Sequence, residues 1–235
     1  MIRIFAVFAL LSISSPGLAQ DYPFQGLAAD IAVNTLHNTL LNATLHSHGE
    51  TEANDDAPGK AGRSRYDRDP RVTERAERQF LDFIHKTSGP AGAATVKAEF
   101  AKRSPVELWA SMVSKDGLKA GDAVDAVAGY WILNWIIANQ AHDQEFSTGP
   151  VLDQVRAALV GSPRFTRLSE AQRQELSEVL MMNFLVQQAV YSQAVTAEDK
   201  DLLRQLSAAA VARFSNEAGV NLRSIELTAA GFAAR

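Results

Sequence analysis

Residues 122–143 have the sequence DAVDAVAGYWILNWIIANQAHD, which is almost continuously apolar and holds two of the three tryptophans of the chain. At about 100° per residue, apolar side chains cover every face of such a helix in its middle, and polar residues gather at its ends. A helix that is apolar nearly all round is normally buried. We therefore predict a buried central helix over about residues 122–143, around which the remaining chain packs.

Four residues of this helix have a specific interpretation. Asp122 and Asp125 have the spacing of an N-cap and N3 pair, which the free amides and the helix dipole stabilise. Asn134 interrupts the apolar run, so we expect it to be buried and hydrogen-bonded, because an unpaired buried amide costs about 1–3 kcal/mol. Gly129 leaves a gap into which another backbone is expected to fit.

The uninterrupted apolar run of this helix is shorter than the roughly 20 residues that span a bilayer.

The first 65 residues divide into three segments by composition. Arg3, an apolar core and the small residues up to Ala19 predict a signal peptide over residues 1–19, cleaved after Ala19. This predicts a periplasmic or secreted protein with no transmembrane segment after cleavage. Residues 20–46 have an amphipathic helical pattern. Residues 47–65 contain no large apolar side chain and predict a flexible linker.

Residues 66–235 are expected to form one helical domain. Start and stop signals divide it into helices of ordinary length; these signals are Asp69-Pro70, Gly89-Pro90, a capping box at Ser104–Glu107, Gly117, Gly149-Pro150, a capping box at Ser169–Gln172, Asp199 and Gly219. No segment alternates like a strand over five or more residues. The fold class is therefore all-α, a single bundle of orthogonal or antiparallel helices around the central one. Its irregular tail is expected to dock with Phe232 in a hydrophobic pocket.

Composition excludes several classes of function. The chain has no cysteine, so it forms no disulfide and offers no thiolate. Its net charge is −4 and it has no basic cluster, which argues against binding to nucleic acid or to anionic membrane surfaces. The partner is therefore expected to be a protein or a small ligand.

Two apolar segments share a short pattern of amide, aromatic and two aliphatic residues. It begins at Asn134 in the central helix and at Asn183 in residues 179–191. We expect these helices to cross, each with a buried asparagine. Tyr130, Trp131, Asn134 and Asn183 are then candidates for contact with a ligand. A carrier of an apolar ligand would use the larger side chains nearby, which are Trp131, Trp135, Met181, Met182 and Phe184, although such residues more often form a simple core.

Asp122 and Asp125 are the one acidic pair beside a large aromatic cluster. Paired carboxylates can act as acid and base when their surroundings separate their pKa values, but end-capping is the favoured interpretation. His46 and His48, with nearby acidic residues, lie in the linker and are interpreted as solvated, so no metal and no cofactor is expected. No nucleotide-binding, zinc-protease or serine-hydrolase motif is present.

Three parts of the chain together carry a resemblance to other proteins. The signal peptide, GDAVDAVAGYWILNWIIANQ at residues 121–140 and LTAAGF at residues 227–232 are similar to an uncharacterised group of short secreted proteins of Gram-negative bacteria. The likeness covers about residues 66–232. It implies an envelope or secreted location and brings no activity, cofactor or catalytic residue.

Three functions follow as hypotheses. The first is a non-catalytic periplasmic or secreted helical module that binds a partner or ligand. The second is an envelope hydrolase that uses Asp122 or Asp125 as acid or base. The third is a carrier of a small apolar ligand.

Overall fold

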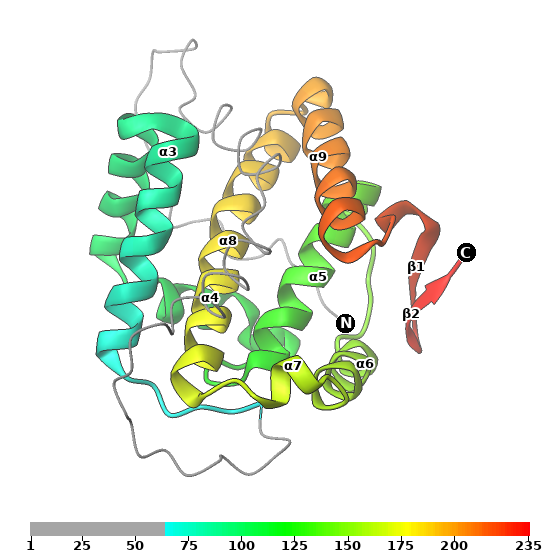
Figure 1. The fold of residues 1–235 in the computed structure, drawn as a ribbon. Coiled ribbons are helices and arrows are strands. Elements are labelled where there is room, and N and C mark those ends of the chain that lie inside the picture. Colours follow the sequence, from blue (N-terminus) through cyan, green and yellow to red (C-terminus); the bar gives the residue numbers. More distant parts are fainter. Residues whose placement is uncertain (1–63) are drawn as a thin grey trace.

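The structure is a computed structural model that describes residues 64–235, and this part of the chain is mostly helical (Figure 1). Its helices, in order, are α3 (Pro70–Lys102), α4 (Pro105–Val113), the 3-10 turn η1 (Ser114–Asp116), α5 (Ala123–Asn139), α6 (Gly149–Val160), α7 (Pro163–Thr166), α8 (Glu170–Thr196), α9 (Lys200–Ala218) and the 3-10 turn η2 (Leu222–Ser224). Strands β1 (Ile225–Thr228) and β2 (Gly231–Ala234) follow. The predicted signal peptide, the segment 20–46 and the linker up to residue 63 lie outside the described residues.

Helix α5 is the centre of the fold, as predicted. It packs against α8, α9 and α6, and Figure 1 shows it between α8 and the C-terminal strands. Its side chains are buried on every face, with only Val127, Trp131 and Asn139 half-buried. The apolar composition of residues 122–143 thus specifies a helix enclosed by its neighbours.

The start of α5 agrees with the prediction and its end does not. The Oδ1 atom of Asp122 accepts a hydrogen bond from the amide of Val124 (3.0 Å), and Asp125 lies in the first turn. The helix ends at Asn139 instead of Asp143, because Gln140 adopts a left-handed conformation with φ 51°. No glycine or proline marks this point, so the sequence did not reveal the stop.

Helix α8 crosses α5 and forms the other half of the core. It begins with the predicted capping box, in which Ser169 and Gln172 each accept a hydrogen bond from the other's backbone (3.2 and 2.8 Å). Asn134 of α5 and Asn183 of α8 are both buried, as the shared pattern predicted. Each Nδ2 donates to a carbonyl one turn earlier in its own helix (2.9 Å in both).

Helix α3 flanks α8 and is kinked where Gly89-Pro90 was expected to stop it. Gly89 has φ 74° and ψ 177°, values outside the helical region that suit glycine. The two halves of α3 fold back beside each other in Figure 1. They meet through the rings of Phe80 and Phe100, whose centroids are 6.1 Å apart.

Two predictions about α4 and its neighbour are wrong. Ser104 makes no capping bond to the first turn of α4; its hydroxyl accepts from Arg68 Nη2 instead (3.2 Å). Gly129 of α5 does not admit another backbone. A methyl group there would meet side-chain atoms of Trp109 at 3.2 Å and Leu118 at 3.3 Å, so side chains fill the gap.

The described chain is mostly helical, as the all-α prediction expects, and two short strands follow the last helical turn. β1 and β2 form a two-stranded antiparallel hairpin, whose four-residue strands are too short for the alternation that we required. The tail docks as predicted, although Phe232 is only half-buried, beside Trp131 (ring centroids 6.1 Å apart). The indole of Trp135 also donates to the carbonyl of Ile225 (3.1 Å), which ties the hairpin to α5.

Ser64 and Tyr66, at the start of the described residues, pair with the backbone that enters α5. The amide of Ala123 donates to the carbonyl of Ser64 (2.9 Å), and the amide of Tyr66 donates to the carbonyl of Gly121 (3.1 Å). Ser64 and Tyr66 are buried. This segment therefore fixes the entry into α5.

Candidate functional site

A polar cluster lies within the apolar interior where α5, α8 and α9 meet. Asn134 of α5 is 0% exposed. Its Nδ2 donates to the carbonyl of Tyr130 (2.9 Å), and its Oδ1 accepts from Nη1 of Arg213 in α9 (2.7 Å). Both ends of the amide are therefore satisfied, as the burial of this residue requires.

Arg213 is the charged member of this cluster, and it is 7% exposed. Its Nη1 also donates to the hydroxyl of Tyr130 (3.3 Å), while its Nε is buried without a hydrogen-bond partner. No carboxylate among the described side chains forms an ion pair with this guanidinium. Burying an ion costs several kcal/mol unless it is paired, so an uncompensated arginine requires an explanation.

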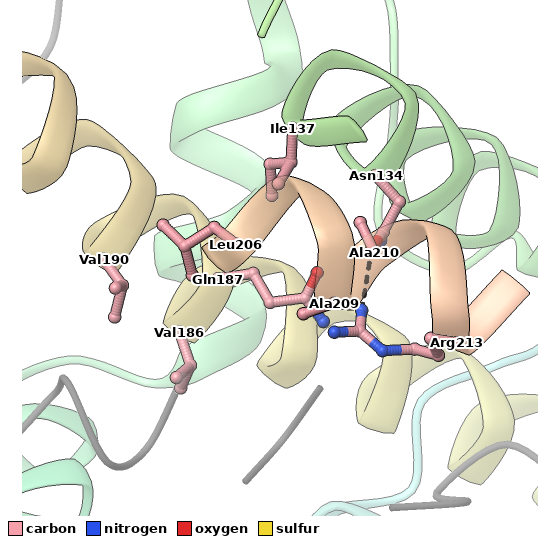
Figure 2. A pocket seen from close by; sticks show the side chains of 9 residues that line it. All are labelled: Asn134, Ile137, Val186, Gln187, Val190, Leu206, Ala209, Ala210 and Arg213. Carbon is pink, nitrogen blue, oxygen red and sulfur yellow. Dashed lines mark hydrogen bonds between the residues drawn. The ribbon is translucent and has the colours of Figure 1, made fainter. Parts of the chain in front are cut away.

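Gln187 of α8 faces this arginine across a hollow. It is 8% exposed, and both its Oε1 and its Nε2 are buried without a partner. Figure 2 shows its amide end extended toward the guanidinium of Arg213. Two adjacent side chains thus present unused hydrogen-bonding atoms to the same space.

The hollow has an apolar wall and a polar end. It is a small cavity of about 10 Å³ that is partly open to solvent. Asn134, Gln187 and Arg213 form the polar end, and the wall is made by Ile137, Val186, Val190, Leu206, Ala209 and Ala210. Ligand sites in proteins commonly combine an apolar lining with a few convergent polar groups.

The structure brings together two of the four predicted ligand-contact residues. Asn134 lines the hollow and Tyr130 hydrogen-bonds to its arginine. Trp131 lies away from it, with its ring edge on Phe214 (4.9 Å between centroids) and beside the hairpin. Asn183 bonds only within α8. The larger residues suggested for an apolar carrier are packed in the core or against it; they are Trp131, Trp135, Met181, Met182 and Phe184.

The sequence patterns used above missed Arg213 and Gln187, although both residues carry a signal. Leu206, Ala210 and Phe214 form the inward stripe of α9, and Arg213 follows Leu206 by seven residues on the same face. Gln187 likewise lies inside the most apolar part of α8. A polar residue on an apolar stripe is the pattern that marks a buried polar site.

Asp122 and Asp125 form a second cluster at the opposite end of α5. They are buried, and Asp122 Oδ2 lies 3.6 Å from Arg65 Nε and 3.7 Å from Arg156 Nη2. Asn134 is nine residues beyond Asp125, or about 14 Å along the helix axis. The acidic pair and the hollow are therefore separate sites.

The two acids differ in their electrostatic surroundings. Burial, and then the negative charge of Asp122, raise the pKa of Asp125 to about 6. Asp122 caps the helix and faces two arginines, Arg65 and Arg156. A carboxyl that keeps its proton to a higher pH, with a second carboxyl nearby, is an arrangement that acid–base chemistry can use.

A third buried carboxyl joins α3 to α8. Glu178 Oε1 accepts from the hydroxyl of Thr73 (3.1 Å) and from Nε2 of Gln174 (3.0 Å), and it lies 3.4 Å from Arg68 Nε. Burial raises the pKa of Glu178. These contacts join segments about 100 residues apart, so the cluster is explained by its role in packing.

Residues 64–235 contain neither a metal site nor a membrane span. No group of three or more histidine and acidic side chains in this range is placed to hold a metal ion. His46 and His48 lie outside it. None of the helices in the described part combines the length and the hydrophobicity that crossing a lipid bilayer requires.

Comparison with known proteins identifies a family and no characterised relative. No curated protein and no solved structure matches the chain. The model of one family, described as a family of unknown function (DUF6683), matches residues 2–235. This match is wider than the resemblance expected over residues 66–232, because it includes the N-terminal segments. Since it covers nearly the whole chain, the protein belongs to this family of unknown function.

Proposed function

We propose that this protein is a non-catalytic periplasmic or secreted helical module that binds a small anionic ligand between α5, α8 and α9. The observation that carries the proposal is the buried guanidinium of Arg213, which has an unpartnered Nε and forms no ion pair with a described carboxylate. A bound anion would supply the missing charge and accept the unused hydrogen bond.

The chemistry of the hollow supports binding without catalysis. Its polar end consists of the amides of Asn134 and Gln187 and the guanidinium of Arg213. Amide and guanidinium groups do not exchange protons readily near neutral pH and are poor nucleophiles. They hold and orient a ligand by hydrogen bonds.

A thermal-shift screen of the full chain tests the binding function. The probes are sodium phosphate, sodium sulfate and sodium hexanoate, with a choline salt as the cationic counterpart. We expect at least one of the anions to raise the melting temperature of the wild-type protein and to have no such effect on Arg213→Met. Stabilisation of both proteins to the same extent, or of neither, would refute the proposal. Mass analysis of small molecules that co-purify with the wild type provides a second readout.

The proposed location rests on the N-terminal sequence. Arg3, the apolar stretch after it and the small residues up to Ala19 have the composition of a signal peptide. Fractionation of expressing bacteria should place the protein in the periplasm or medium, with a mass that corresponds to cleavage after Ala19. An uncleaved chain in the cytoplasm would contradict this assignment.

The hydrolase is the second candidate, and one observation favours it. Asp125, with its pKa raised to about 6, lies near a second acid, Asp122, which is close to Arg156. The full chain should be assayed with chromogenic esters, glycosides, phosphoesters and peptides. Turnover by the wild type that Asp125→Asn abolishes would establish the enzyme. Equal rates for the two proteins would exclude this role for Asp125.

A further inference from the structure

We propose that the hollow binds an aliphatic monocarboxylate, with its carboxylate against Arg213 and Gln187 and its hydrocarbon chain along the apolar wall. This inference rests on the binding function proposed above and names the ligand class. Three features of the hollow support it, namely the free edge of the guanidinium, the single positive charge and the composition of the wall.

The guanidinium has one edge occupied and one edge free. Nη1 donates to Asn134 and to Tyr130, and these bonds fix the plane of the group. Among residues 64–235, neither Nε nor Nη2 of Arg213 donates a hydrogen bond, and Nε is buried. Nε and Nη2 point in parallel, which is the geometry that receives two carboxylate oxygens.

Gln187 adds a neutral donor at the same place. Its amide faces Arg213 across the hollow in Figure 2, and neither of its polar atoms has a partner. The Nε2 group can donate to a carboxylate oxygen that Arg213 already holds. One ligand group would therefore satisfy unpartnered atoms on α8 and on α9 together.

The charge at the hollow fits a monoanion. Arg213 is the one cationic side chain among the described residues that line it. A single buried guanidinium balances one negative charge, whereas a phosphate dianion would remain half compensated in an apolar surrounding. This favours a carboxylate over inorganic phosphate.

The wall selects for a hydrocarbon chain. Val186 and Val190 of α8 and Leu206 of α9 line it, and burial of methylene groups against such a surface is favourable. The hollow has room for about one water molecule and is partly open to solvent. The carboxylate would take the place of that water, and the hydrocarbon chain would leave the hollow along its apolar wall on the open side.

Another buried arginine provides a matched control. Arg173 of α8 is 8% exposed and its Nε is also buried without a partner, but its Nη1 donates to the carbonyl of Leu168. Arg173 does not line the hollow. Arg173→Met therefore removes an equally buried guanidinium without changing the proposed site.

The experiment is a titration of the ¹⁵N-labelled full chain followed by NMR at the arginine Nε–Hε resonances. The probes are hexanoate, hexanol, sodium phosphate, N-acetyl-alanyl-leucine and the amide of that dipeptide. We expect hexanoate to shift the Arg213 resonance and to bind at least about tenfold (1.4 kcal/mol) more tightly than hexanol or phosphate. N-acetyl-alanyl-leucine should likewise bind more tightly than its amide. Tighter binding of hexanoate than of the dipeptide acid assigns a free fatty acid as the source of the carboxylate, and the reverse order assigns a polypeptide C-terminus; both support the proposal.

The variants separate binding from folding. Arg213→Met and Gln187→Met should each weaken hexanoate binding, the former by about tenfold or more, while Arg173→Met should leave it unchanged. Arg213→Lys is used if the methionine variant does not fold. It should bind hexanoate more weakly than the wild type because lysine lacks the two parallel N–H donors of arginine. Phosphate binding that depends on Arg213, without hexanoate binding, would overturn this inference and leave the proposed function intact. If no probe binds, both fail.

Discussion

Asn134 and Asn183 show how one residue type serves two purposes in the same core. Both are buried, and both donate to a carbonyl of their own helix. Asn134 alone also accepts a hydrogen bond from a buried cation, Arg213. The oxygen of Asn134 is therefore one of the polar contacts that hold α9 against α5.

Replacing Asn134 should cost more stability than replacing Asn183. Asn134→Leu leaves Nη1 of a buried guanidinium without its carbonyl acceptor, at a cost of about 2–3 kcal/mol. Asn183→Leu removes only a bond within α8, so its cost should be about 1 kcal/mol or less. Urea unfolding monitored by circular dichroism measures both. Equal losses would show that the contact with Arg213 does not contribute to folding.

Asp125 should make the stability of the fold depend on pH. Its pKa is about 6 in the folded protein, against an ordinary value of 3.8. Between these values the folded state keeps a proton that the unfolded chain has lost, so stability falls as the pH rises from about 4 to above 6, by up to roughly 2–3 kcal/mol.

Asp125→Asn tests this effect because it cannot ionise. The variant should gain stability over the wild type at about pH 7.5 and should not gain it near pH 4. Asp143→Asn, at an exposed side chain, serves as the control and should leave the stability unchanged at both pH values. Parallel pH profiles for wild type and Asp125→Asn would contradict the raised pKa.

Helix starts depend on bonds that similar sequences do not always form. Ser169 and Ser104 each precede a helix and each has a glutamine or glutamate three residues later. Ser169 forms the reciprocal capping bonds, whereas the hydroxyl of Ser104 is taken by Arg68. A nearby side chain from another segment thus decides whether the same motif functions as a cap.

This difference can be measured by two alanine substitutions. Ser169→Ala should destabilise the fold by about 1 kcal/mol, because an amide of α8 loses its acceptor. Ser104→Ala should change the stability by less than about 0.5 kcal/mol, since only an exposed contact is lost. Chemical unfolding of both variants provides the comparison, and a larger loss for Ser104→Ala would contradict the assignment.

Segments from both ends of the described chain pack against α5. Ser64 and Tyr66 pair with the backbone that enters α5, and the hairpin accepts the indole hydrogen bond of Trp135 near the end of α5. Figure 1 shows α3 and the hairpin on opposite sides, with α5 and α8 between them. Residues 64–66 and the hairpin therefore cover parts of α5 that the long helices leave uncovered.

Removing the hairpin should therefore destabilise the whole domain. A chain that ends at Ser224 loses the buried Leu227 and the acceptor of Trp135, which together cost at least about 3 kcal/mol. Tryptophan emission should shift to longer wavelength as Trp131 loses its cover. Glu226→Gln, at an exposed strand position, is the control and should behave as the wild type. Unchanged emission and stability on truncation would show that the tail is dispensable.

Local patterns were sufficient to predict most helices and their central member. The apolar circumference of α5, the cap at Asp122 and the kink at Gly89 depend on residues a few positions apart, because helix periodicity and capping act over one or two turns. The two short strands were missed for a related reason, since four residues carry too little alternation to distinguish a strand from an irregular tail. The end of α5 was missed because Gln140 adopts a left-handed conformation, which a glutamine in the sequence does not indicate.

The candidate site could not be obtained in this way. Asn134 and Arg213 are 79 residues apart, and Gln187 lies on a third helix. Each looks like an ordinary polar residue until packing removes it from water, and packing leaves hydrogen-bonding atoms of Arg213 and Gln187 without a partner. Burial and the position of partners are properties of the assembled helices, because desolvation depends on everything that surrounds a group. The amino-acid order was enough to determine a buried central helix and most of the helices around it. The packing of α5, α8 and α9 decided that the unpaired charge of Arg213 faces a hollow.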